Sequence, residues 1–382
     1  MTKPKILFVA NAVLGWRTYA RQLETVLAAR QDVDGTVLYR TPGRWAMQLA
    51  RRHADGPLGR RLRPFDPIQL FAGRSGHDIR QAVARLRPDV VHLAAHWPAG
   101  ALLAARVPFT IALDATRAGL SRDLPLPGWG QVECQREARL CRAAAHVFPM
   151  SQWAADSLQD DYDIPKSRIT VQPPTLLPEH WPENWPENWP ERWPDQCSRE
   201  PARDRPQILF VGNDLQRKGA HRLARWVEGP LDGRCHLHIV STDRKSRPPN
   251  GPHVTFHGPI PHDRLISEVM PSMDIFCLPT RLDMSPFVLV EAAAAGLPSV
   301  ASRLAGISDL VSDGATGLLV QPDDDSGFVQ ALRRLIEDAP LRRRMGTAAR
   351  RRAEEAFDGR RGFNHLIDRL VTIAAAQGSD PL

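Results

Sequence analysis

The sequence has little of what three common protein classes require. It contains five cysteines, at positions 134, 141, 197, 235 and 277, and no CxxC pair. That number and spacing argue against a disulfide framework and a cysteine zinc site, and they predict a reducing cytoplasm. No apolar run approaches the ~20 residues that a membrane-spanning helix needs. The apolar stretch KILFVA near the start is short and predicts a first core strand rather than a signal peptide.

Acidic residues are scarce between positions 40 and 63, where seven arginines cluster: Arg40, Arg44, Arg51, Arg52, Arg60, Arg61 and Arg63. Much of the formal net charge of +7 comes from this segment. It is either a solvated surface or a contact for an anionic partner, which would be the cytoplasmic face of a membrane or a phosphorylated acceptor. No nucleic-acid recognition fold accompanies the charge, so nucleic acid is not an expected partner.

What the sequence does contain is a regular alternation of strand-like and helix-like segments. In the first half, the strand candidates are KILFVA, DVDGTVLY, DVVHLAA and PFTIALDAT, and in the second half QILFVGND, CHLHIVST, VTFHG and DIFCLPT. The two halves open on similar strands, at 5–11 and 207–213. We therefore predict the α/β class, with two Rossmann-like, doubly wound parallel-sheet domains facing an interdomain cleft.

Between the halves lies HWPENWPENWPERWPDQ (180–196), with a tryptophan every fourth residue from Trp181 to Trp193. The equally frequent prolines exclude a regular helix or a central strand. The repeat is either an exposed connector or an aromatic platform that stacks on sugar rings. We expect a first domain over 1–178, a linker over 179–205, a second domain over 206–360, and a C-terminal helix over 361–382 that packs back toward the first domain.

Two segments of the second domain carry residues suited to a phosphorylated ligand. In FVGNDLQRKGA (210–220), Gly212 permits a tight turn after a strand, and Arg217 and Lys218 precede a helix, where cations can meet a phosphate. Basic pairs are also common on surfaces, so the spacing alone does not decide.

In DMSPFVLVE (283–291), Asp283 lies in the loop after a strand, Pro286 is close to a helix start, and Glu291 lies one or two turns into that helix. Backbone N–H groups around 285–287 would form an anion site. Carboxylates bind hydroxyls rather than phosphates, so acids on either side of a phosphate site fit a nucleotide sugar. The alternative is an acid that favours the helix dipole plus a solvated glutamate.

The stretch from about 274 to 325, which includes EAAAAGLPSVAS and DGATGLLVQPDD, resembles the donor-binding signature of glycosyltransferase family 4. The segments 210–220, 150–181 and 343–371 resemble further parts of the same family. The resemblance implies the GT-B fold, a retaining sugar transfer, an acceptor-side first domain and a nucleotide-sugar-binding second domain.

For the donor, the resemblance implies that Arg217 and Lys218 neutralise the diphosphate and that Glu291 accepts hydrogen bonds from the ribose hydroxyls. Asp283 would hold hydroxyls of the transferred sugar. The backbone of Ser285, Pro286 and Phe287, together with Gly212 and Gly15, would approach the donor. The two cations make a bound metal unnecessary, and no DxD motif is placed to hold one. No cofactor or metal is therefore expected.

The sequence departs from the family pattern at several positions. Asp283 stands where the commonest family form has glutamate, and Asp114 stands where many members have a histidine near the sugar. Asp114 is therefore a catalytic candidate alongside Asp283, or else only caps a turn. The acceptor-side or sugar-side candidates are Trp16, Arg17, His92 and His96. At least one of these histidines is expected to be a buried structural residue.

The leading hypothesis is a retaining, metal-independent hexosyltransferase that uses a nucleotide-diphosphate sugar and a carbohydrate or lipid-linked acceptor in cell-surface polysaccharide, glycolipid or glycoconjugate biosynthesis. The alternative keeps the fold as a catalytically impaired sugar-nucleotide-binding or scaffold protein. A basic membrane adaptor would explain the charge but not the motifs, and a GT-B epimerase is a further option within the enzyme class. The donor sugar and base, the acceptor and the linkage are not readable from the sequence.

Overall fold

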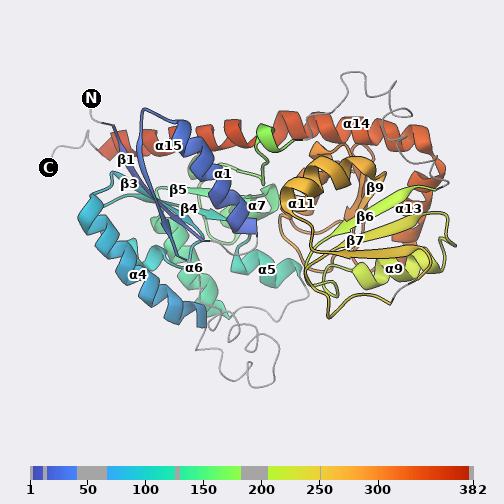
Figure 1. The fold of residues 1–382 in the computed structure, drawn as a ribbon. Coiled ribbons are helices and arrows are strands. Elements are labelled where there is room, and N and C mark those ends of the chain that lie inside the picture. Colours follow the sequence, from blue (N-terminus) through green and yellow to red (C-terminus); the bar gives the residue numbers. More distant parts are fainter. Residues whose placement is uncertain are drawn as a thin grey trace. The chain divides into compact units, whose positions relative to one another are not determined.

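The computed structural model describes residues 3–11, 15–40, 67–124, 130–181, 205–249 and 251–377. The chain forms two compact units, Met1–Gln172 with Arg361–Leu382, and Pro173–Arg360. Figure 1 shows that each unit combines a central sheet with flanking helices. Both units are therefore α/β, as the alternating pattern predicts.

The first unit contains a five-stranded sheet with the order β2-β1-β3-β4-β5. Its strands are β1 (Lys5–Ala10), β2 (Asp34–Tyr39), β3 (Val90–Ala94), β4 (Phe109–Leu113) and β5 (His146–Pro149). Every neighbouring pair is parallel. The apolar runs named above therefore form the strands that they predict. The chain reverses its winding direction between β1 and β3, the kind of position where doubly wound folds bind ligands.

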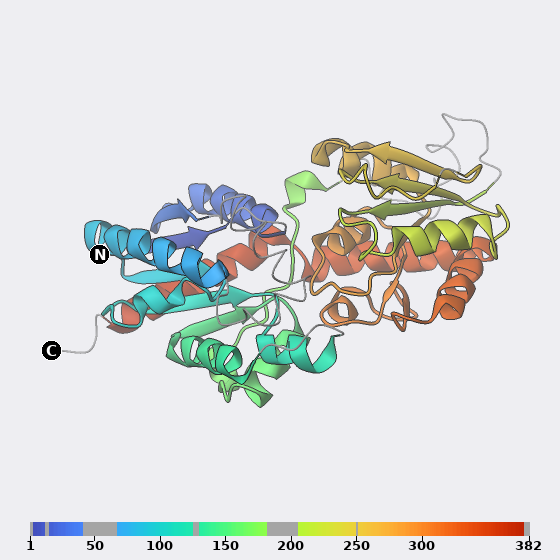
Figure 2. The same cartoon turned by 90° about the horizontal axis from the view of Figure 1, so that it is seen from below.

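Helices cover both faces of this sheet. They are α1 (Gly15–Ala29), α4 (Pro67–Leu86), α5 (Arg117–Asp123), α6 (Gln131–Ala143), α7 (Gln152–Asp160) and α15 (Gly359–Gln377), with short turns η1 (Ala99–Leu102) and η2 (Lys166–Arg168). Figures 1 and 2 show α4 and α6 on one face, and α1 and α15 on the other.

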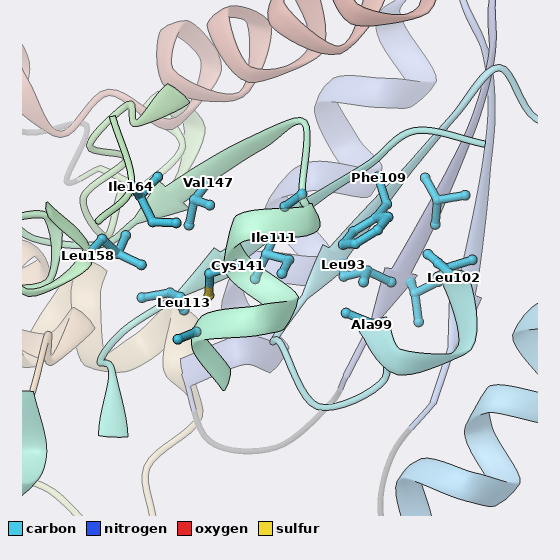
Figure 3. Close-up of a cluster of buried hydrophobic side chains, with 14 of the residues drawn as sticks. Leu93, Ala99, Leu102, Phe109, Ile111, Leu113, Cys141, Val147, Leu158 and Ile164 are labelled. Atoms are coloured by element: carbon cyan, nitrogen blue, oxygen red, sulfur yellow. The ribbon is translucent and has the colours of Figure 1, made fainter. Parts of the chain in front are cut away.

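Successive side chains along each strand point to opposite faces of the sheet, so each face has its own hydrophobic core. Ile111 and Leu113 lie beside Cys141 of α6, and Leu93 lies beside Phe109 and Ala99 in the same cluster (Figure 3). Each fully buried aliphatic side chain of this kind stabilises the fold by roughly 1.5–3 kcal/mol. On the opposite face, Tyr19 of α1 packs edge-on against Phe363 of α15, with ring centroids 5.0 Å apart. The last helix is thus held to the first unit by aromatic packing.

The second unit contains a six-stranded sheet with the order β11-β10-β9-β6-β7-β8. Its strands are β6 (Gln207–Val211), β7 (His236–Val240), β8 (Val254–Gly258), β9 (Ile275–Leu278), β10 (Ser299–Ser302) and β11 (Gly317–Val320). All pairings are parallel. Counted from β6, the strand order is that of dinucleotide-binding Rossmann sheets, and the winding reverses between β6 and β9.

The main helices of this unit are α9 (Ala220–Glu228), α11 (Phe287–Ala294), α13 (Asp325–Glu337) and α14 (Ala339–Ala356). Shorter pieces are α10 (His262–Arg264), α12 (Ile307–Leu310), η3 (Pro178–His180), η4 (Leu265–Val269) and η5 (Met270–Ser272). Trp226 of α9 stacks on Phe328 of α13 at 5.2 Å, while Arg350 of α14 donates to Ala294 O at the end of α11. Gly327 N donates to Asp324 Oδ1, so Asp324 caps α13.

Parts of the connector and of the arginine-rich segment lie outside the described residues. Of the repeat tryptophans only Trp181 is described; its ring lies 4.7 Å from the Arg350 guanidinium and its Nε1 donates to Leu176 O. Of the stretch 40–63 only Arg40 is described, with its Nε 3.0 Å from Asp78 Oδ2. Within the described ranges, no helix is both long and apolar enough to cross a membrane.

Candidate active site

The loops that follow β6 and β9 meet at the point where the second sheet reverses its winding. These two strands are neighbours in the sheet, so the residues after them lie at one edge. The loops are joined by a hydrogen bond from Arg281 N to Arg217 O, 3.1 Å long. Thr280 Oγ1 donates to Leu282 O, also at 3.1 Å. The segments 212–219 and 279–286 thus form one structure, although the sequence separates them by some sixty residues.

Two glycines shape the first of these loops. Gly219 precedes α9 with φ +87°, and a Cβ there would lie 2.2 Å from Pro279 O. A Cβ on Gly212 would lie 2.6 Å from Lys218 Cδ. Glycine is therefore required at 219 by both conformation and space, while Gly212 leaves room for the lysine to fold back over the end of β6.

The folded-back lysine meets the first of the two predicted acids. Lys218 Nζ lies 2.9 Å from Asp283 Oδ2, and both side chains are 16% exposed. This oxygen accepts no well-aligned hydrogen bond, but the distance to the ammonium establishes an ion pair. A hydroxyl donor could therefore replace the ammonium at Asp283 without leaving a buried carboxylate unpaired.

Arg217 has different surroundings from Lys218. Its Nε lies 2.9 Å from Asp214 Oδ2, its Nη1 donates to Leu282 O, and Nη1 lies 3.9 Å from Asp283. A guanidinium has five N–H donors, so these contacts fix the side chain to the loop without using all of them. Lys218 is the better placed of the two cations to contact a ligand directly.

Within the described residues, the start of α11 leaves some polar groups without protein partners. Pro286 is the N-cap residue and supplies no side-chain hydrogen bond, and the first N–H groups of a helix have no acceptor within it. Beside it, the buried Ser285 Oγ has no hydrogen-bond partner in the described part of the chain. Phe287 is the first helical residue. An anion at this helix end would satisfy these donors.

The second predicted acid, Glu291, lies inside α11 and is 8% exposed at its side chain. His262 Nε2 lies 2.8 Å from Glu291 Oε1, and the histidine is about half exposed. Sequence reasoning did not single out His262. It follows β8 from another part of the chain, so no spacing signal could have connected it with Glu291.

In the first unit, the predicted residues gather after β1, β3 and β4. Asp114 follows β4 directly and is half-buried. Gly15 begins α1, Trp16 packs edge-on against Tyr19 at 5.3 Å, and Arg17 is exposed on the first turn. The preceding residues 12–14 lie outside the described part.

His92 lies in the core, which corrects its assignment as a sugar-side residue. It is 1% exposed. Its Nε2 lies 2.9 Å from Tyr19 Oη, and its Nδ1 lies 2.8 Å from Thr110 Oγ1. Burial lowers the pKa of His92 to about 3. The imidazole is therefore neutral, with both nitrogens used in packing the sheet against α1.

His96, by contrast, is half-buried and pairs with a buried acid. Its Nδ1 lies 2.9 Å from Glu137 Oε1. Tyr162 Oη and Arg117 N donate to Glu137 Oε2 at 2.5 and 2.6 Å. Burial would raise the pKa of Glu137, but His96, Tyr162 and Arg117 N outweigh it and hold that pKa below its ordinary value. His96 is thus fixed at the carboxyl edge of the sheet.

Two units of this kind, with a cationic turn and an acid-flanked helix start in the second, define the GT-B class of glycosyltransferase. Two family models match the chain: "Glycosyltransferase Family 4" over residues 15–176 and "Glycosyl transferases group 1" over residues 205–338. The chain belongs to glycosyltransferase family 4 and is a glycosyltransferase.

Similarity to characterised proteins extends along most of the chain. Glycogen synthase of Mycobacterium tuberculosis is 28% identical over 355 residues, which cover 87% of this chain and 76% of that protein. Sucrose-phosphate synthase from Thermosynechococcus elongatus superposes with a TM-score of 0.75 at 18% identity, covering 98% and 100% of the two chains. Anabaena Alr3699/HepE, solved in complex with UDP-glucose, gives 0.67 at 17% identity, with 96% and 99% covered. These structures share the fold.

Proposed function

We propose that the protein is a retaining glycosyltransferase that moves a sugar from a nucleotide-diphosphate sugar to a carbohydrate or lipid-linked acceptor, in cell-surface polysaccharide, glycolipid or glycoconjugate biosynthesis. One observation carries the proposal. Lys218 and Asp283 are paired beside the unsatisfied start of α11, and Glu291 lies farther along the same helix. This arrangement supplies a cation and N–H donors for a diphosphate, with a carboxylate for hydroxyls on each side.

The difficult step is breaking the bond between the anomeric carbon and the diphosphate oxygen. Negative charge grows on the leaving diphosphate while the sugar becomes oxocarbenium-like. Lys218 and the first-turn N–H groups of α11 stabilise that charge, and Arg217 holds the lysine-bearing loop and adds positive potential. Since these cations perform the charge stabilisation, we propose that no metal ion takes part.

Each acid has a separate task in this proposal. When the diphosphate attracts Lys218, Asp283 is released to accept hydrogen bonds from hydroxyls of the transferred sugar. Glu291 accepts hydrogen bonds from the ribose, and His262 fixes the orientation of its carboxylate. Ser285, Pro286 and Phe287 line the diphosphate, and Asp114, Gly15 and Trp16 serve the sugar side from the first unit.

The names of similar proteins support the donor and acceptor classes. Alr3699/HepE is named as a complex with UDP-glucose, and a lipopolysaccharide core glycosyltransferase of Rhizobium meliloti is 26% identical over 184 residues, 46% of this chain and 51% of that protein. A catalytically impaired binding protein is not favoured, because Lys218 and both carboxylates, Asp283 and Glu291, are present. We place the reaction in the cytoplasm, at the membrane face, where the 40–63 segment would meet anionic lipids.

Product stereochemistry tests the proposal. The purified protein is incubated with UDP-, GDP-, ADP- and dTDP-sugars and simple glycoside acceptors, and the anomeric configuration of the product is read by proton NMR. We expect retention, with activity unchanged by EDTA. A product of inverted configuration would refute the retaining mechanism, and activity that EDTA abolishes and magnesium restores would refute metal independence.

A further inference from the structure

A pocket that is separate from the loops that bind the donor in our proposal lies in the first unit. It has a volume of about 370 Å³ and is formed by α4, η1 and α6, together with the residues that follow β3 and β4. Figure 1 shows α4 and α6 side by side on one face of the sheet. The pocket therefore reaches the carboxyl edge of the acceptor-side sheet.

Arginines dominate the charge of this pocket. Its lining includes Arg80 from α4, Arg117 from the start of α5, and Arg136 and Arg139 from α6. Arg136 and Arg139 are three positions apart, so they project from the same side of the helix. Across the described ranges, no acid forms an ion pair with Arg80, Arg136 or Arg139. Neighbouring cations that form no ion pair with an acid create a positive potential that attracts an anion.

The one carboxylate in the lining is Glu137, and it is already engaged. It is fully buried and receives His96, Tyr162 Oη and the Arg117 backbone N–H. These contacts keep it ionised, as its lowered pKa indicates. Glu137 therefore fixes the floor of the pocket, and within the described residues it forms no ion pair with Arg80, Arg136 or Arg139.

One wall of the pocket is apolar. Trp97 and Pro98 line it, together with Leu103, which is 38% exposed and is one of three exposed large hydrophobic side chains in the described part of the chain. A ligand that fits both walls carries an anionic group next to a ring or an aliphatic chain. Arginine forks match the oxygens of both carboxylates and phosphates in pairs. Three arginines that have no paired acid among the described residues balance the double charge of a phosphate monoester better than the single charge of a carboxylate, which favours the phosphate ester.

We propose that this pocket binds the phosphoryl group of the acceptor, so that the enzyme glycosylates a phosphorylated acceptor. This inference rests on the proposed function, because it assumes a transfer reaction with an acceptor. The phosphoryl group belongs either to a lipid headgroup or to a soluble sugar phosphate, and the chemistry of recognition is the same for both. Arg80, Arg136 and Arg139 hold the phosphate oxygens, and Trp97 and Leu103 cover the adjoining apolar part.

Binding of inorganic pyrophosphate, measured by calorimetry, tests the pocket directly. The full chain carries Lys218→Ala throughout, which removes the cation that contacts the diphosphate directly in the proposed donor site. Arg136→Gln/Arg139→Gln is compared with the control Arg85→Gln/Arg106→Gln, which removes two exposed arginines of the same unit outside the pocket. We expect the first pair to weaken binding by about tenfold or more and the control by less than about twofold. Equal weakening by both pairs, or no weakening, would overturn the proposal.

Two further measurements identify the phosphate source and separate this inference from the proposed function. Both measurements compare the same two pairs of substitutions with Lys218 intact. One is flotation of the protein with phosphatidylcholine vesicles that contain phosphatidylglycerol. The other is competition of glucose 6-phosphate with pyrophosphate for binding. If only the pocket pair loses vesicle binding, the phosphate belongs to a lipid headgroup. If only the pocket pair loses competition, it belongs to a soluble phosphate. If the pocket pair loses neither, the proposal is overturned. Donor hydrolysis should stay within about twofold in Arg136→Gln/Arg139→Gln. Absence of hydrolysis in the wild type would instead refute the proposed function.

Discussion

The side chain of Lys218 pairs with Asp283 in the free protein and, in our proposal, with the diphosphate in the donor complex. It is held between Gly212 and Asp283, so it is already positioned before a ligand arrives. We predict that Lys218→Ala lowers kcat/KM for the sugar donor by about 10²–10³-fold, because one preorganised charge at the leaving group is lost. Steady-state kinetics measures this loss, with Arg264→Ala as the control, because Arg264 is an exposed arginine paired with Glu268. A loss of the same size in both variants would contradict the assignment.

The pairing of His262 with Glu291 gives a second prediction. Glu291→Ala should weaken donor binding by about tenfold, and His262→Ala by less, since the histidine acts through the carboxylate. In the double variant the two effects should not add, because His262 has nothing left to orient. Calorimetric dissociation constants for all four proteins test this. Additive effects would mean that His262 contacts the donor independently or plays no part through Glu291.

His92 contributes to the pH dependence of stability. Burial lowers its pKa to about 3, whereas an unfolded histidine binds a proton near pH 6.5. Its stabilising contribution is complete above pH 6.5 and is lost progressively as pH falls toward 3. Between pH 7 and 5 we expect it to account for roughly 2 kcal/mol of lost unfolding free energy. Urea unfolding of His92→Gln should show a correspondingly smaller decline than His77→Gln, an exposed control; equal declines would contradict this.

At the scale of elements, the turn between β6 and α9 depends on Gly219. Alanine there would adopt a left-handed conformation and also collide with Pro279 O. Gly314 has a similar φ of +74° but nothing near its missing Cβ, so Gly314→Ala isolates the conformational cost of about 1 kcal/mol. We predict that Gly219→Ala costs more than that and also weakens donor binding. Urea unfolding and donor titration of both variants measure this; equal stability losses would show that the contact with Pro279 is unimportant.

The sequence predicted the elements that its local chemistry determines. The run KILFVA forms β1, and Pro286 precedes α11 because proline fixes the backbone at a helix start. What it could not predict depends on contacts between distant segments. The ion pair between Lys218 and Asp283, and the partner of Glu291, arise from strand order in the sheet. The burial of His92 arises from packing against α1, which no local pattern reveals.

At the scale of the whole molecule, the chain repeats one architecture with different tasks. Both units contain a parallel sheet in which the winding of the chain reverses near the middle. In each unit, polar residues follow strands at the carboxyl edge of the sheet, where such folds bind ligands. The unit 173–360 carries the cationic turn and the acid-flanked helix, whereas the first unit carries Asp114 and an arginine-lined pocket. This division matches a two-substrate reaction, in which one unit selects the donor and the other the acceptor.

In the proposed function, the chain binds a nucleotide-diphosphate sugar through Lys218 and Glu291. The most direct measurement is the thermal shift of the wild type, Lys218→Ala and Glu291→Ala with a panel of UDP-, GDP-, ADP- and dTDP-sugars. At least one donor should stabilise the wild type, and each substitution should reduce this stabilisation. Stabilisation of all three proteins to the same extent, or of none by any donor, would contradict it.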